Sequence, residues 1–317
     1  MTSPQSFPLI LIAIYSTLLP LWARAQSSQA LFDAVRNSDL EKTRSLLDKG
    51  ADPNSYDSDS DHILMDAAFY SSADMMRLLL EKGSNPNAVN REKETPLMWS
   101  TNDIDKIKLL LQHGADVNVR SRAGNTALLI ACIGYGKFDI VKLLIDHGAD
   151  VAIRNDRKEN ALIRAALFGD TSTIALLLSK GIDINAKDNE GYTALLNSIL
   201  NVNRHVTIQL LDKGADPDIV GAFTLTAISA AVTYNDTESV IAILAKTKNI
   251  DAIDKDGITS LMWAVYNEHD NVAIIQALLD KGADVNLKSK DGSTALSWAL
   301  KKGNTATVAL LKKAGAK

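Results

Sequence analysis

A five-residue signature recurs along almost the whole of this 317-residue chain, at intervals of about 33 residues. It reads Gly-Ala-Asp-x-Asn or a close variant, and it begins at Gly50, Gly83, Gly114, Gly148, Gly181, Gly214, Gly282 and Gly315. In the one unit without this glycine, we assign Asn249 to the glycine position. A fixed period of this length indicates small units that stack and bury their apolar faces against one another. Such a stack needs no single large core, which agrees with an aromatic content of only 5%.

Each repeat also carries the signals of two short helices. A threonine or a substitute stands about 21 residues before each glycine, as at Thr193, with 19 residues in the shorter repeat that begins at Thr95. Its hydroxyl can cap the first amides of a helix, and Pro96 suits the first helical position, where its missing N–H is not needed. Paired leucines such as Leu46–Leu47 indicate a second helix, which the glycine ends by adopting a left-handed conformation.

Together, the period, the threonine start and the glycine signature resemble the ankyrin repeat, from Gln29 to Lys317. The resemblance implies an all-α fold, an α-solenoid of about nine repeats over residues 26–317, each a helix-turn-helix unit with a hairpin loop. The expected units span residues 26–57, 58–90, 91–121, 122–155, 156–188, 189–221, 222–255, 256–289 and 290–317. The histidine that the family usually has after Thr-Pro-Leu is absent. We expect apolar contacts to replace it, since its places hold mostly methionine, leucine and isoleucine, with Ser229 and Ser297 in two units.

Residues 1–25 have the pattern of a secretory signal peptide. The run from Phe7 to Ala23 is almost wholly apolar, and Ala23-Arg24-Ala25 provides the small residues of a cleavage site. The segment before the run has no lysine or arginine, so an uncleaved anchor remains the alternative. The pattern resembles that of signal-peptide-bearing bacterial ankyrin-repeat proteins. It predicts an exported protein, periplasmic in a Gram-negative cell and otherwise secreted, with no membrane insertion after cleavage.

The composition argues against several classes of function. With 34 Lys+Arg against 38 Asp+Glu, the chain lacks the basic character of a nucleic-acid-binding protein. The single cysteine, Cys132, allows neither an internal disulfide nor a cysteine-based zinc cluster, and we expect a buried, inert thiol rather than a reactive one. The five histidines lack the spacing of a helical metal pair. We therefore expect no catalytic residues, no cofactor, no metal and no enzyme activity.

One acidic run needs a separate interpretation. In the run Asp57-Ser-Asp-Ser-Asp61, aspartates alternate with serines, as carboxylates do at the start of a calcium-binding loop. The glycine and the later bidentate glutamate that such a loop requires are missing. The run is therefore interpreted as a solvated hairpin tip.

Aromatic residues occupy one register of the repeat. In the ankyrin pattern, the seventh and eighth positions after the threonine face a concave groove, and the aromatic residues at or near them are Phe69, Tyr70, Tyr135, Phe168, Tyr234 and Tyr266. Aromatic side chains are favoured anchors for protein partners. The alternative explanation is that these aromatic side chains simply cover the edge of the helix and contact no partner. Trp99, Trp263 and Trp298 share a neighbouring register, for which we expect half-buried packing.

The expected hairpin tips differ in charge along the chain. Their basic residues are Arg120, Arg122, Arg154, Arg157 and Lys158, and the acidic ones lie near the start of the chain. Such an asymmetry could orient a protein partner, or the tips could simply be solvated. The resemblance implies a monomeric, non-catalytic scaffold or adaptor that binds a protein partner in an exported compartment. A secreted effector that binds a host protein is the alternative.

Overall fold

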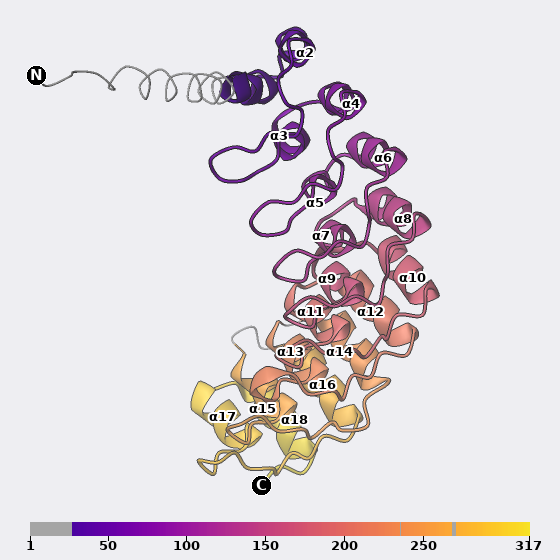
Figure 1. The fold of residues 1–317 in the computed structure, drawn as a ribbon. Helices are drawn as coiled ribbons and strands as arrows, with labels where there is room; N and C mark the ends of the chain where they lie inside the picture. The colour runs from indigo at the N-terminus through magenta and orange to yellow at the C-terminus, as the bar shows by residue number, and fades with distance from the viewer. Residues whose placement is uncertain (1–26, 235, 268–270) are drawn as a thin grey trace, which may run out of the picture. The chain divides into compact units, whose positions relative to one another are not determined.

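The computed structural model describes residues 27–234, 236–267 and 271–317, in which short helices follow one another in pairs (Figure 1). The first helices lie at residues 27–36 and at α3 (Ile63–Tyr70), α5 (Pro96–Trp99), α7 (Ala127–Ala131), α9 (Ala161–Phe168), α11 (Ala194–Leu200), α13 (Ala227–Thr233), α15 (Ser260–Tyr266) and α17 (Ala295–Lys302). The second helices are α2 (Leu40–Asp48), α4 (Ala73–Glu81), α6 (Ile104–Gln112), α8 (Phe138–Asp146), α10 (Thr171–Ser179), α12 (Arg204–Asp212), α14 (Thr237–Leu244), α16 (Val272–Asp280) and α18 (Thr305–Lys313). A short 3-10 turn, η1 (Ala222–Thr224), precedes α13. The expected all-α solenoid is confirmed.

The predicted signal peptide, residues 1–25, lies outside the described residues. Within the described ranges, every helix is too short or too polar to cross a bilayer.

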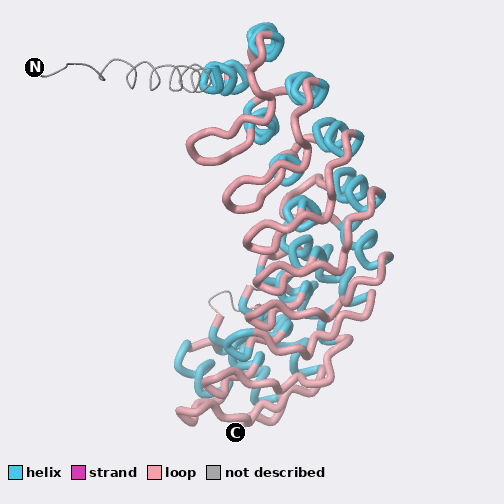
Figure 2. The backbone as a smooth tube through the Cα atoms, viewed as in Figure 1, coloured by secondary structure: helices cyan, strands magenta, loops and turns pink. Residues whose placement is uncertain are grey.

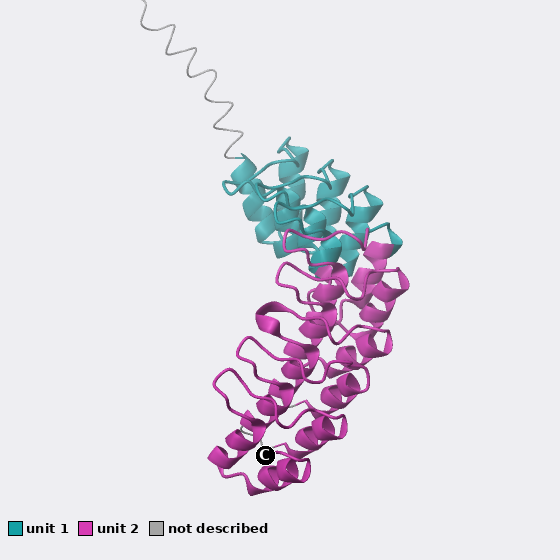
Figure 3. Cartoon of the chain, turned by 90° about the horizontal axis from the view of Figure 1, so that it is seen from below, with its two compact units in different colours: residues 1–130, 146–149 teal, residues 131–145, 150–317 magenta. Residues whose placement is uncertain are grey.

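The chain divides into two compact units, one of residues 1–130 and 146–149 and the other of residues 131–145 and 150–317 (Figure 3). In the second unit, alternate helices from α9 to α17 pack one on the next, and alternate helices from α10 to α18 form the layer beside them. In the first unit, α3 packs on α5, and α4 packs on both α2 and α6. Loops connect these helices and project beyond them (Figure 2). Apolar side chains such as Leu64, Leu79 and Leu210 are fully buried between the layers, so each repeat completes the core of its neighbours.

The helix start and stop signals are confirmed. Thr95, Thr193 and Thr259 each accept a hydrogen bond from the amide three residues later, and Asn160 caps α9 in the same way. His62 caps α3 by accepting from the amide of Leu64, two residues later. Glycines such as Gly50 and Gly282, both at φ +93°, follow the second helices in the left-handed region. At Ser229 and Ser297, the expectation of apolar contacts in place of the family histidine is wrong, because both hydroxyls hydrogen-bond the capping threonine.

The last residue of the signature joins consecutive repeats. The Asn87 side chain donates to the Gly114 carbonyl at 2.9 Å and accepts from the Asp116 amide at 2.7 Å. The corresponding bonds are made by Asn54, Asn118, Asn185, Asp218, Asp251 and Asn286. We call these contacts the inter-repeat bridges. Ala152 holds the bridging position of the fourth signature and has no side-chain polar group to make the bond.

The bridges correct the assignment of the seventh repeat. Asn249 does not stop a helix in the glycine position, because α14 already ends at Leu244 and no residue from 245 to 253 is left-handed. Asp251, rather than Ile253, makes the bridge by accepting from the Asp284 amide at 3.0 Å. Without the glycine, the backbone after α14 takes a different conformation. In it, the Thr247 hydroxyl and the Lys248 amide donate hydrogen bonds to the Asp218 carboxylate.

We predict that Asn87→Ala lowers the free energy of unfolding by about 1–3 kcal/mol, since two hydrogen bonds of about 0.5–1.5 kcal/mol each are lost. Asn87→Asp should lose less, because an aspartate keeps the acceptor, as Asp218 and Asp251 do. Urea unfolding followed by circular dichroism measures both changes.

The reverse substitution is the control. Ala152→Asn should stabilise the chain by up to about 1 kcal/mol, because the Ala152 amide already bonds Asp150 as the other signatures do. Equal stability of Asn87→Ala and the wild type would show that the bridges contribute nothing.

Candidate functional site

The exposed aromatic residues emerge where the first helices end. In α3, every residue from Ile63 to Ala68 is buried, so the last two positions, Phe69 and Tyr70, are the first to reach solvent. Tyr266 is likewise the last residue of α15, and Tyr234 directly follows α13. The predicted register therefore marks one end of the first-helix layer within each unit.

In the first unit, three rings form a cluster. Phe69 and Tyr70 are 67% and 53% exposed and lie edge to face, with ring centroids 4.8 Å apart. The centroid of Phe69 is 6.0 Å from that of Trp99, whose indole N–H donates to Glu94 at 3.0 Å. Trp99 is half-buried, as the sequence predicts, but it also supports an exposed ring.

In the second unit, Tyr135 and Phe168 form a pair. Tyr135 lies in the turn after α7 and is 76% exposed. The centroid of its ring is 5.8 Å from the ring centroid of Phe168. The flanking Gly134 and Gly136 both have positive φ, which allows the chain to present Tyr135 outside any helix. Phe168 is only half exposed, and Tyr234 is 47% exposed.

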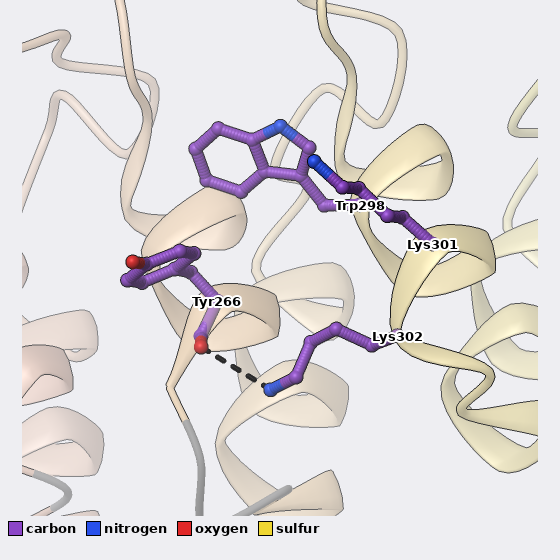
Figure 4. A pocket seen from close by; sticks show the side chains of 4 residues that line it. All are labelled: Tyr266, Trp298, Lys301 and Lys302. Atoms are coloured by element: carbon purple, nitrogen blue, oxygen red, sulfur yellow. Dashed lines mark hydrogen bonds between the residues drawn. The ribbon is translucent and has the colours of Figure 1, made fainter.

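A second cluster of three rings lies in the last two repeats. Tyr266 stands between two tryptophans, with ring centroids 5.7 Å from Trp263 and 5.6 Å from Trp298. A hollow lies on either side of Tyr266. One, of about 180 Å³, is lined by Thr233, Trp263, Tyr266 and Asn267. The other, of about 470 Å³, is lined by Tyr266, Trp298, Lys301 and Lys302, and we call it the C-terminal pocket (Figure 4).

The basic residues of the hairpin tips have different surroundings. The guanidinium of Arg122 bonds the Arg91 carbonyl, and that of Arg154 bonds the carbonyls of Lys158 and Lys187. These two side chains therefore connect neighbouring hairpin tips by hydrogen bonds. The interpretation of the tips as simply solvated does not anticipate this structural role. Arg120, Arg157 and Lys158 are exposed. Because Arg120 and Arg122 belong to the first unit and the other three to the second, the charges form two separate groups here.

The acidic run near the start is partly buried, so its interpretation as a solvated tip is wrong for Asp57. That carboxylate accepts from the amides of Asp59 and Asp61 and pairs with Arg36 at 2.6 Å. Arg36 also pairs with Asp66, where burial raises the pKa of the carboxyl to about 6. Asp57 therefore joins the acidic run to the first repeat through Arg36. Asp59 is exposed, as the interpretation as a solvated tip expects.

His62 and Cys132 are two further titratable groups that are buried. Burial lowers the pKa of His62 to about 4, and its neutral ring accepts from the Leu64 amide as a helix cap. Cys132 is buried, and burial raises the pKa of its thiol to about 12, which suppresses the reactive thiolate. No group of three or more metal-ligating side chains occurs among the residues that the structure describes.

Sequence reasoning missed two exposed aromatic residues, Tyr56 and Phe223, of which Phe223 is the more exposed. Phe223 lies in the η1 turn of a loop whose counterparts in other repeats are polar, and it is 78% exposed. Phe223 and Thr224 both have positive φ, at 57° and 61°. This conformation is unfavourable for most residues other than glycine and asparagine. A sequence signal was present, since Gly221-Ala-Phe-Thr224 replaces the polar turn.

The paired helices, the hairpin loops and the bridges define an α-solenoid repeat protein. A family model described as Ankyrin repeats (3 copies) matches the chain over residues 31–121, 64–155, 102–188, 128–221, 195–289 and 227–317. The chain belongs to the ankyrin-repeat family. No curated protein gives a significant match to the sequence.

We predict that Phe223→Asn stabilises the chain by about 0.5–1 kcal/mol, because asparagine tolerates positive φ far better than phenylalanine. Phe223→Ala removes the same ring but keeps the strain, and it serves as the matched control. Thermal unfolding compares the two variants. Equal stability of the asparagine and alanine variants would mean that the backbone at residue 223 is unstrained.

Proposed function

We propose that this chain is a monomeric, non-catalytic scaffold that binds a protein partner through the aromatic residues at the ends of its first helices. Ankyrin repeats suggest protein–protein interaction as the general role. The observation that carries the more specific proposal is the exposure of large rings in one register, from Phe69 to Tyr266. Exposed apolar side chains gathered in clusters, as within each unit here, are typical of interaction sites, and tyrosine is enriched among binding hot spots.

The ring contacts add to this proposal. The pairs Phe69–Trp99 and Tyr135–Phe168 join residues of neighbouring repeats, with ring centroids about 6 Å apart. Each exposed ring is thereby supported by a less exposed one, which reduces the entropy lost on binding. Phe223 offers a further apolar contact on a loop, at a position where its backbone conformation is strained.

The proposed setting is an exported compartment, and its support is the signal-peptide pattern of residues 1–25. A secreted effector that binds a host protein uses the same binding surface and differs in destination. The balanced charge supports a protein partner over nucleic acid. Cell fractionation distinguishes a periplasmic adaptor from a protein released into the medium.

For cleavage after Ala25, we expect the protein purified from its native compartment to begin at Gln26. Intact-mass spectrometry measures this directly. A mature species that begins at Met1 would contradict cleavage and favour the uncleaved anchor.

We predict that replacing Tyr70, Phe168 and Tyr266 together by alanine abolishes partner capture in crosslinking pull-downs from the native compartment. The three rings are exposed or half exposed, so the fold should survive the change. The matched control replaces Ile241 and Val272 by alanine, since both are exposed apolar residues of second helices. If the triple variant is folded and captures the same proteins as the control, the aromatic surface is not the interface.

A further inference from the structure

The C-terminal pocket has aromatic walls from two neighbouring repeats. Tyr266 closes α15 and is 60% exposed, while Trp298 of α17 is half-buried. Their rings are tilted by 59°, and Figure 4 shows them with Lys301 and Lys302 around one open space. A volume of about 470 Å³ lies within the usual range for ligand pockets, roughly 300–1,000 Å³. The walls offer a flat apolar side chain two ring surfaces at once.

Lys302 places a fixed positive charge beside these rings. Its ammonium group donates to the carbonyls of Val265, Tyr266 and Asn267, at 3.2, 3.2 and 2.8 Å. These carbonyls end α15, so the cation also meets the negative end of that helix. An ammonium group has three donors, and all three are engaged here. Lys302 therefore acts on a ligand through its charge and by holding the end of α15 in place.

Lys301 supplies the second charge. It lines the same pocket, is exposed, and forms no ion pair with any residue in the described part of the chain. Its ammonium group can therefore pair directly with an anion that enters the pocket.

The surrounding repeat has the same sign. Residues 290–317 contain six lysines and one aspartate, a formal charge of +5, although the whole chain carries −4. Lys312 and Lys313 lie in α18, beside the helix that carries Trp298. Residues 256–289, which supply Tyr266, carry a formal charge of −3, so the attraction for a negatively charged partner comes from the last repeat, which carries Lys301.

We propose that the C-terminal pocket binds an acidic peptide segment of a protein partner, taking an aromatic side chain against the walls formed by Tyr266 and Trp298 and an adjacent carboxylate at Lys301. This inference rests on the proposed function and names the chemistry of one part of its surface. Charge complementarity selects acidic segments, and the rings select those that carry an aromatic residue. Single-stranded nucleic acid also combines negative charge with flat rings, but it requires a basic groove that continues along the strand.

Fluorescence anisotropy with the purified full chain tests this proposal. The probe is a fluorescein-labelled peptide with one tryptophan flanked by aspartate and glutamate. Two comparison peptides replace the acidic residues by asparagine and glutamine, or the tryptophan by alanine. We expect each comparison peptide to bind at least fivefold more weakly, and binding of the probe to weaken as salt rises. Equal binding of the three peptides, or no binding of the probe at millimolar protein, overturns the proposal.

Variants locate the binding. Trp298→Ala and Lys301→Glu should each weaken binding of the probe peptide by about tenfold or more. Lys313→Glu makes the same charge change in the same repeat, outside the residues that line the pocket, and should have less than a threefold effect. Should Lys313→Glu weaken binding as much as Lys301→Glu, the peptide responds only to the overall charge and the pocket proposal is wrong. Lys301 is exposed, so its variant remains informative even if Trp298→Ala does not fold.

Two outcomes separate this proposal from its alternatives. Tighter binding of a labelled oligothymidylate than of the acidic peptide would overturn it in favour of single-stranded nucleic acid. If Trp298→Ala and Lys301→Glu leave partner capture unchanged while the triple alanine variant abolishes it, the pocket proposal fails and the proposed function stands.

Discussion

The inter-repeat bridge is the contact on which the regularity of this chain depends. A single repeat leaves one apolar face open, and burial against a neighbour is non-directional, so it does not by itself fix how two repeats are aligned. The bridge supplies that alignment. In Asn87, one side chain meets a carbonyl and an amide of the next repeat, so two neighbours can satisfy it in only one register. Both groups come from the turn that ends a helix, where backbone polar groups would otherwise lack partners.

This alignment places equivalent positions of neighbouring repeats within reach of each other. Trp263 and Trp298 occupy the same register, and each contacts Tyr266 at a ring-centroid distance below 6 Å. Lys302 then bonds the end of α15 from the following repeat, as Lys106 bonds the Ala68 carbonyl in the first unit. A residue near a helix end in one repeat thus completes the surface of the repeat before it. The aromatic clusters follow from the same period that stabilises the helices.

Much of the fold could be predicted because its signals are local. The threonine caps and the left-handed glycines act within a few residues, and their roles are read directly from spacing. The partners of Asn87, Arg154 and Asp57 lie about 20–35 residues away, so their roles need the packed structure. The same limit explains the misplaced Asn249, since a missing glycine changes the path of the chain. For the candidate site, the register of exposed rings was predictable, whereas the pocket beside Tyr266 depends on side chains from two repeats.

The bridges involve nearest neighbours alone, and this has a consequence for how such a chain can change in evolution. Asn54 and Asn286 make the same contacts near opposite ends of the sequence, without reference to how many repeats lie between them. Duplication or loss of a whole repeat that carries the bridging residue therefore leaves each remaining bridge with both of its partners. The number of repeats, and with it the length of the surface offered to a partner, is therefore set by the gene and not by the inter-repeat bridges.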